Sequence, residues 1–263
     1  MIRICMAGAR GRMGRRILEM AAGTEGFAVG GAFDVPEHAG EVMRLADGAA
    51  EITLASSAAE ALTNADALID FSVAEACVDN ARAAAEQGKP AVVGTTGLTA
   101  EQLQALKDLS RRIALVHAPN MSVGVNLLFK LTADVAQRLG LDYNVEITEI
   151  HHNQKKDSPS GTAARLGECA AEVLGLEYGR DVVHGRHGMP GARPRREIGM
   201  HALRGGDVAG EHTVSFIGQG ERVELTHKAH SRDNFAQGAL RAAQFAASAA
   251  PGLYDMQDVL GLR

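Results

Sequence analysis

Short apolar runs alternate with segments of helical periodicity through the first half of the chain. Apolar runs bounded by small or polar residues predict buried strands, and apolar residues that recur every three or four positions predict helices. Strands separated by helix-length segments predict a parallel sheet with helices on its faces. The expected strands are residues 2–7, 27–33, 67–69, 91–93 and 113–116, with helices following at about 74–87 and 100–111.

The pattern changes after about residue 122. A helical pattern covers 123–139, an alternating strand pattern covers 144–151, and a second helical pattern covers 163–174. Three further strand patterns, parted by glycine clusters, follow a loop at 184–196 that is rich in Gly, Pro, Arg and His. This order predicts a mixed or antiparallel sheet in a second domain. The three strands are expected at 198–203, 211–218 and 222–229, before a last helix at 235–247.

The composition narrows the class of protein. The chain has 263 residues, of which 46% are hydrophobic and 22% are charged, as in ordinary globular proteins. Its formal net charge of −5 argues against a partner that is nucleic acid or an anionic membrane. No apolar run approaches the roughly 20 residues that span a bilayer. Three scattered cysteines predict reduced thiols in a cytoplasmic protein, without a disulfide framework or a metal site: Cys5, Cys77 and Cys169.

A glycine-rich turn follows the first expected strand. The segment Gly8-Ala9-Arg10-Gly11-Arg12-Met13-Gly14 opens a helix, where free N–H groups and the helix dipole favour a pyrophosphate. Asp34 ends the second expected strand, at the distance of a ribose ligand. The first domain is therefore predicted to be a Rossmann-like dinucleotide-binding domain, with a glycine turn that binds no ligand as the alternative. Asp34 followed by Val35 favours NADH over NADPH, and Arg10 or Arg12 could compensate for the carboxylate.

The densest polar segment lies in the second domain, from His151 to Thr162. Its two adjacent histidines suit one metal ion poorly, because neighbouring side chains on a strand point to opposite faces. We expect one ring to transfer a proton and the other to bind an anion, with Lys155 as a nearby cation or acid. Ser160-Gly161-Thr162 is expected at the start of the next helix, where backbone N–H groups bind a carboxylate. The alternative is a surface loop in which Ser160 or Thr162 caps the helix.

These motifs resemble those of the 4-hydroxy-tetrahydrodipicolinate reductase family, also called dihydrodipicolinate reductase. The glycine turn is shared with many dehydrogenases, whereas His151-His152-x-x-Lys155 before Pro-Ser-Gly-Thr is specific to this family. Matching segments extend along nearly the whole chain: Asp70-Phe71-Ser72, Gly94-Thr95-Thr96-Gly97, Asn120 to Asn126, Glu149 to Thr162, Gly210 to Thr213, and Thr226 to Ala229.

The resemblance implies NAD(P)H-dependent reduction of 4-hydroxy-tetrahydrodipicolinate, with loss of water, in diaminopimelate and lysine biosynthesis. His151 matches the proton-donating histidine and Lys155 the catalytic lysine. The substrate carboxylates are implied to contact His152, Gly161 and Thr162, beside Ser160. The implied cofactor contacts are Gly8, Ala9, Arg10, Gly11, Arg12, Met13, Asp34, Gly94, Thr95, Thr96, Ala118, Pro119, Asn120 and Met121.

The family pattern also implies a domain division and an assembly. Residues 1–122 and 233–263 would form the dinucleotide-binding domain, and 123–232 a substrate-binding and oligomerisation domain that builds a homotetramer. The chain departs from the pattern at Asp34, which is often Glu, and at Val35, where some members carry Arg. Both departures argue against strong use of NADPH.

Two other interpretations compete with this one. A dehydrogenase for another substrate, of the aspartate or homoserine type, would keep the glycine turn but would not require the polar segment around His151. A nucleotide sensor that binds NAD(H) without turnover would have a Rossmann domain joined to a dimerising module. It would be supported by a helix-turn-helix or a basic arm, and the sequence has neither.

Overall fold

The structure is a computed structural model that describes residues 1–45, 48 and 50–263. The chain forms two compact units, Met1–Val123 with Arg232–Arg263, and Gly124–Ser231. Each unit has its own apolar core and sheet. Of the helices in the described ranges, none combines the length and the apolar character that crossing a membrane requires.

The first unit is built on a six-stranded sheet of order β13-β7-β6-β5-β1-β2, in which every neighbouring pair is parallel. The alternating pattern predicted a parallel sheet and all of these strands except β13. The strands are β1 (Ile2–Ala7), β2 (Phe27–Phe33), β5 (Ala67–Asp70), β6 (Ala91–Val93), β7 (Ala114–His117) and β13 (Gly252–Tyr254). A separate hairpin is formed by β3 (Val42–Leu45) and β4 (Ala50–Thr53).

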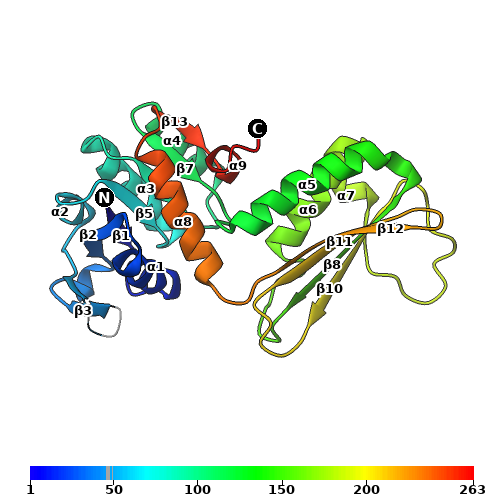
Figure 1. The fold of residues 1–263 in the computed structure, drawn as a ribbon, viewed down its shortest axis with the longest axis horizontal. Coiled ribbons are helices and arrows are strands. Elements are labelled where there is room, and N and C mark those ends of the chain that lie inside the picture. The colour runs from blue at the N-terminus through cyan, green and yellow to red at the C-terminus, as the bar shows by residue number, and fades with distance from the viewer. Residues whose placement is uncertain (46–47, 49) are drawn as a thin grey trace. The chain divides into compact units, whose positions relative to one another are not determined.

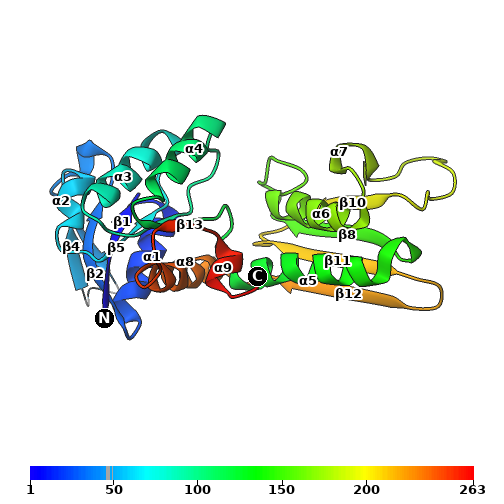
Figure 2. The same cartoon turned by 90° about the horizontal axis from the view of Figure 1, so that it is seen from above.

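Helices cover both faces of this parallel sheet. Alternate strand residues point to opposite faces, so Ile4 and Met6 lie in one apolar cluster and Cys5 and Ala7 in another. Figure 2 shows α1 (Arg12–Gly23) and α8 (Asp233–Ala246) on one side of the strands. The other side carries α2 (Ala58–Leu62), α3 (Ala74–Glu86) and α4 (Ala100–Leu109). Short elements complete the unit: η1 (Pro36–His38) and α9 (Met256–Val259).

The strand order reverses between β1 and β5, which lie side by side although β2 follows β1 in the chain. Ligands of open parallel sheets bind at the carboxyl ends of the strands at such a reversal. The glycine turn after Ala7 and the segment after Asp70 meet there, since a Cβ on Gly8 would lie 2.6 Å from the carbonyl oxygen of Phe71. The fold thus places the candidate dinucleotide loop at the expected position.

The second unit contains a five-stranded mixed sheet of order β12-β11-β8-β10-β9. β10 pairs with β8 in parallel, whereas β11 pairs with β8 antiparallel. In Figure 1, α5 and α6 lie along this sheet, and their apolar residues share a core with Val145, Ile147 and Phe216. The elements are α5 (Val123–Leu139), η3 (Gly140–Asp142), β8 (Asn144–His151), α6 (Gly161–Leu174), α7 (Tyr178–Asp181), β9 (Val182–His184), β10 (Ile198–Arg204), β11 (Glu211–Ile217) and β12 (Arg222–Lys228).

The sequence analysis missed β3 and β4, the five-residue helix α2 and several of the shortest elements. β9 and β13 have three residues each, and α7 and α9 have four. Segments of this length show no apolar period, and β13 is held in place by pairing with β7 rather than by its own pattern. The loop expected at 184–196 does connect β9 to β10, but two of its arginines bind Glu146 on β8.

Candidate active site

The glycine turn joins β1 to α1 in a conformation that depends on the absence of side chains. Gly8 has a φ of +75°, in the left-handed region that favours glycine. A Cβ on Gly14 would lie 2.1 Å from the carbonyl oxygen of Gly8, so helix and turn pack backbone to backbone. This geometry fits a dinucleotide, because it leaves the first turn of a 12-residue helix accessible to phosphate oxygens. Arg10, Gly11 and Arg12 are exposed on the turn, whereas Ala9 is buried and Met13 is partly buried.

Asp34 directly follows β2 and lies beside this turn. One of its carboxylate oxygens accepts the backbone N–H of Arg10 at 2.8 Å, and the other accepts the N–H of Val35 at 2.9 Å. The side chain therefore orders the turn while staying partly exposed. The guanidinium of Arg10 forms an ion pair with Glu41, and its Nη1 lies 2.8 Å from Nδ1 of His38. The guanidinium of Arg10 is thus already paired with a carboxylate, that of Glu41.

The other two predicted cofactor segments follow β6 and β7. The hydroxyl of Thr95 donates to the buried carboxylate of Asp70 at 2.6 Å, and a Cβ on Gly94 would lie 2.3 Å from the ring of Phe71. Thr96 is exposed. Ala118 and Met121 point into the apolar core, so their backbone is the part that can reach a cofactor. Pro119 is exposed and Asn120 is partly exposed.

Asp70 joins the strand ends of the first unit, a role that the sequence analysis did not assign. It is fully buried and accepts the backbone N–H and the hydroxyl of Ser72, at 3.0 and 2.8 Å. The amide of Asn80 donates to its second oxygen at 2.8 Å. With Thr95, these donors are all neutral. The motif Asp70-Phe71-Ser72 was visible in the sequence, but Asn80 and Thr95 are brought to it by the fold.

The polar segment of the second unit begins at the end of β8. Glu149 and His151 lie two residues apart on one face of the strand, and His151 Nδ1 lies 2.6 Å from an oxygen of Glu149. Glu149 is fully buried. Its other oxygen accepts the backbone N–H of Ser160 at 3.0 Å, and Arg204 binds both oxygens, at 2.7 and 2.9 Å. Burial would raise the pKa of Glu149, but these donors hold it below its usual value.

The second ring nitrogen of His151 lies next to Gly210. With a carboxylate at Nδ1, the ring places its Nε2 toward the space beside Gly210. A Cβ on Gly210 would lie 3.0 Å from that Nε2, and the φ of Gly210 is +151°. The glycine therefore provides space beside the nitrogen that can carry a proton to a substrate. Sequence reasoning did not assign this role to Gly210, although it lies in one of the family's motifs.

His212 on β11 is a second residue that the predictions omitted. It pairs in register with Glu149, and its ring lies edge-on to that of His151 with centroids 5.2 Å apart. Its Nε2 is 2.9 Å from the hydroxyl of Ser160. Burial lowers the pKa of His212 to about 3, so the ring is neutral at physiological pH. It borders His151 without adding a charge.

The start of α6 is arranged for an anion. Ser160 is the N-cap: its buried hydroxyl accepts the N–H of Ala163 at 3.1 Å, as the alternative interpretation of this residue expected. Gly161 is exposed, and a Cβ there would meet nothing within 4 Å. Thr162 is partly exposed. At the N-terminus of this 14-residue helix, an anion can therefore approach at Gly161 and Thr162, whereas the Ser160 hydroxyl is already occupied by the cap.

Lys155 and His152 lie in the loop between β8 and α6. The ammonium of Lys155 is 2.8 Å from both carboxylate oxygens of Asp157, and this hydrogen bond lowers the pKa of Asp157. The buried Nδ1 of His152 has no hydrogen-bond partner among the described residues. Within the same described residues, no three side chains of His, Cys, Asp or Glu are grouped as metal ligands.

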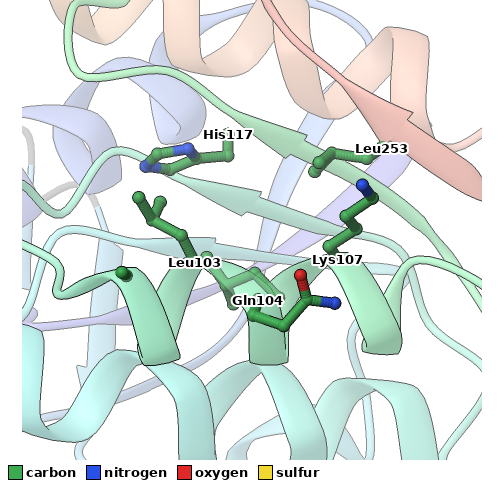
Figure 3. Close-up of a pocket in the computed structure, with 7 residues that line it drawn as sticks. Leu103, Gln104, Lys107, His117 and Leu253 are labelled. Atoms are coloured by element: carbon green, nitrogen blue, oxygen red, sulfur yellow. The ribbon is translucent and has the colours of Figure 1, made fainter.

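A hollow of about 300 Å³ lies elsewhere in the first unit, between α4 and the strands β7 and β13. Figure 3 shows His117 and Leu253 facing Leu103, Gln104 and Lys107 of α4 across it. Burial lowers the pKa of His117. None of the predicted site residues lines this hollow. The predicted site residues thus lie at strand ends and helix starts, outside this hollow.

Comparison with known proteins shows which protein family this chain matches. Residues 2–121 match the family described as "Dihydrodipicolinate reductase, N-terminus", and residues 124–260 match "Dihydrodipicolinate reductase, C-terminus". A 4-hydroxy-tetrahydrodipicolinate reductase from Syntrophotalea carbinolica is 49% identical, and one from Geotalea uraniireducens is 48% identical. In both cases the match covers 100% of each chain.

A solved structure supports the fold independently. Dihydrodipicolinate reductase from Paenisporosarcina sp. TG-14, with dipicolinate bound, superposes with a TM-score of 0.79 over 98% of both chains. The sequence identity is 23%, so this likeness bears on the fold. It confirms the predicted fold class, a Rossmann-like parallel sheet and a separate unit with a mixed sheet.

Proposed function

The chain belongs to the dihydrodipicolinate reductase family, and we propose that its two units divide that family's reaction between them. The reaction is the NAD(P)H-dependent reduction of 4-hydroxy-tetrahydrodipicolinate to tetrahydrodipicolinate, with loss of water, in diaminopimelate and lysine biosynthesis. The chain is an oxidoreductase, which replaces the interpretation as a sensor without turnover. The first unit, with the glycine turn, would hold the nucleotide, and the second would hold the dicarboxylate.

Proton donation is assigned to His151. Its hydrogen bond with the buried Glu149 is the observation that carries the assignment, because it orients the ring and leaves Nε2 for the substrate. A nucleotide held at the glycine turn would supply the hydride for the unsaturated ring of the substrate. His151 would neutralise the negative charge that develops there, and Lys155 would act as a second acid. Asp157 would hold the ammonium of Lys155 in position.

Substrate recognition is assigned to two anion sites. The N–H groups at Gly161 and Thr162 would bind one carboxylate at the start of α6. The imidazole of His152 would contact the other carboxylate; its buried Nδ1 has no hydrogen-bond partner among the described residues. Ser160 would act indirectly, since its hydroxyl caps the helix and contacts His212. A dicarboxylate matches this arrangement because each site neutralises one negative group.

The nucleotide preference is proposed to be for NADH. The turn at Gly8 to Met13 would hold the pyrophosphate, and Asp34 would accept hydrogen bonds from the ribose hydroxyls. The backbone at 94–96 and 118–121 would line the rest of the dinucleotide. A 2′-phosphate would meet the carboxylate of Asp34, and the neighbouring cation, Arg10, is already paired with Glu41. The adjacent Val35 is exposed and uncharged.

A homotetramer is proposed, assembled through the second unit. The sheet face opposite α5 and α6 carries side chains such as Thr148, Thr213 and Thr226, and the apolar core of the second unit lies on the other face. Sheet faces of this kind commonly pack against another sheet. Light scattering should give four times the 27.6 kDa mass of one chain. A monomeric mass at working concentrations would exclude this assembly.

A cytoplasmic location is proposed from the cysteines. Cys5, Cys77 and Cys169 are buried and unpaired in the described structure. Burial raises the pKa of the Cys5 and Cys77 thiols to about 12, which keeps them protonated and unreactive. Such thiols suit a reducing compartment. Fractionation of producing cells should recover the activity with cytoplasmic markers.

A coupled assay tests the reaction. The preceding synthase would generate the unstable substrate from pyruvate and aspartate semialdehyde, and the absorbance of NADH or NADPH would be followed. We expect oxidation that requires the synthase and is faster with NADH. If NADPH is the better donor, the assignment of Asp34 and Arg10 is wrong. If folded protein oxidises neither nucleotide, the assignment of substrate is wrong.

A further inference from the structure

Arg204 contacts both parts of the candidate catalytic apparatus. It is the last residue of β10 and pairs in register with His151 of β8. Its two terminal nitrogens bind the two oxygens of Glu149, at 2.7 and 2.9 Å. One of these nitrogens also donates to the backbone carbonyl of Asp157 at 2.8 Å. Glu149 orients His151, and Asp157 binds Lys155. The guanidinium of Arg204 therefore contacts both Glu149, which orients His151, and Asp157, which binds Lys155.

The contact with Arg204 offsets the cost of burying the Glu149 carboxylate. A carboxylate with no exposed surface is costly unless opposite charge and hydrogen bonds compensate for it. His151 alone is a weak source of that charge, because it must give up a proton during turnover. Arg204 remains charged throughout the cycle and matches both carboxylate oxygens in one plane. It can therefore keep Glu149 in place while the charge on His151 changes.

The contact with Asp157 acts on the loop between β8 and α6. The carbonyl of Asp157 lies in the same residue whose carboxylate holds Lys155. Ser160, three residues later, donates its N–H to Glu149. The loop is thus attached to Arg204 directly at Asp157 and through Glu149 at Ser160. The positions of Lys155 and of the α6 N-terminus depend on these attachments.

We propose that Arg204 is a positioning residue that holds His151 and Lys155 in one arrangement, through Glu149 and the Asp157 carbonyl. The inference rests on the proposed function, because it takes these two residues as the acids. Arg204 does not contact the substrate in this scheme. Its effect is on the orientation of groups that do, so its loss should change the rate and its pH dependence more than nucleotide binding.

The test compares full-length Arg204→Met and Arg204→Lys with the unaltered enzyme in the coupled assay. We expect kcat to fall about 10²-fold in Arg204→Met, because misplacing a catalytic group has effects of this size. The fall should be smaller in Arg204→Lys, because lysine keeps the charge but cannot make the planar contact with both carboxylate oxygens. KM for NADH should be unchanged. The acidic limb of the kcat profile should move to higher pH in Arg204→Met, because Glu149 without its cation takes up a proton more readily.

A second measurement does not depend on turnover. In ¹⁵N spectra of ring-labelled histidine, assigned with His151→Gln, the His151 Nδ1 signal should be that of a protonated nitrogen bound to a carboxylate. It should change in both Arg204 variants. Arg195→Met is the matched control, since Arg195 forms an exposed ion pair with Asp142, away from His151 and Lys155. It should leave kcat, the pH profile and the spectrum unchanged.

The outcomes separate this inference from the proposed function. If the unaltered enzyme shows no synthase-dependent oxidation, the proposed function fails, and the ¹⁵N spectra still test the arrangement around His151. If the enzyme is active and Arg204→Lys keeps normal kcat, pH profile and spectrum, Arg204 is not a positioning residue. A variant that loses thermal stability but none of these three properties would likewise overturn the proposal.

Discussion

Each unit contains a fully buried carboxylate at the ends of its strands, but the two carboxylates have different partners. Asp70 in the first unit accepts hydrogen bonds from neutral donors on Ser72, Asn80 and Thr95. Glu149 in the second unit is bound by the cation Arg204 and by the titratable ring of His151. Neutral hydrogen-bond donors suit a carboxylate with a structural role, such as Asp70, which connects the segments that follow neighbouring strands. Charged and titratable partners suit one that supports proton transfer.

The difference extends to how each unit would bind its ligand. The first unit presents backbone, and its glycines are needed because a Cβ at Gly8, Gly14 or Gly94 would collide with neighbouring atoms. Besides the N–H groups at the start of α6, the second unit presents side chains whose orientations are fixed by hydrogen bonds. Substitutions should therefore act by steric exclusion in the first unit and by loss of charge or orientation in the second. The predictions below test this contrast.

The largest effect is expected from His151→Gln. The substitution removes the proton donor but keeps a polar side chain, so kcat should fall by about 10²–10⁴-fold. Binding of NADH, measured by calorimetry, should be unchanged because the glycine turn lies in the other unit. His187→Gln, in the exposed loop before β10, is the control and should be fully active. A kcat within threefold of normal would remove His151 from the mechanism.

The charged contacts of the second unit should make it sensitive to acid. Burial would raise the pKa of Glu146, but hydrogen bonds from Arg186, Arg193 and His201 hold it at about 2, below its ordinary 4.5. That difference corresponds to about 3 kcal/mol of stability, complete above pH 4.5 and lost as the pH falls toward 2.

Urea unfolding of the unaltered protein and Glu146→Gln at pH 7, 4 and 3 measures this contribution. The variant should be less stable at pH 7, and the difference should shrink as the pH falls. A difference that stays constant with pH would show that Glu146 contributes through packing rather than through its charge.

Asp70→Asn should affect stability rather than chemistry. The amide keeps the shape but turns an N–H group toward donors from Ser72, Asn80 or Thr95, and an unsatisfied buried donor costs about 1–3 kcal/mol. We expect a lower midpoint of thermal unfolding and, at saturating NADH, a kcat close to normal. A loss of kcat as large as that of His151→Gln would mean that the two buried carboxylates do not differ in role.

Gly14→Ala should weaken nucleotide binding without affecting the second unit. The new Cβ would lie 2.1 Å from the Gly8 carbonyl, and overpacking of this kind costs about 1–3 kcal/mol. Affinity for NADH should fall about tenfold or more, while dipicolinate binding should be unchanged. Gly23→Ala, at the end of the same helix, meets no atom within 4 Å and is the control. Equal affinities in the two variants would contradict the steric argument.

The smallest effect is expected from Glu41→Gln. Exposed ion pairs contribute about 0.2–1 kcal/mol, so freeing Arg10 should raise kcat/KM for NADPH by at most about fivefold. The value for NADH should stay the same. Glu51→Gln, which breaks the exposed pair with Arg44, is the control. If the ratio of kcat/KM for NADPH to kcat/KM for NADH is unchanged, Arg10 does not approach the 2′ position of the nucleotide.

The sequence by itself determined the order of the long elements, the two kinds of sheet, and the motifs that carry the site. These follow from local patterns, because apolar period, glycine turns and helix starts are properties of neighbouring residues. The segment from His151 to Thr162 was recognisable for the same reason. The domain bounds, the residue roles and the nucleotide preference remain predictions.

The tertiary structure alone decided which distant residues complete the site. Arg204 lies 55 positions from Glu149 in the chain, and the hydroxyl of Ser160 and the ring of His212 are 52 positions apart. These pairs meet because β10 and β11 flank β8 in a particular register, and a shift of one residue would turn their side chains to the other face. No local pattern encodes that register, so the partners of the buried carboxylates became visible only in the folded chain.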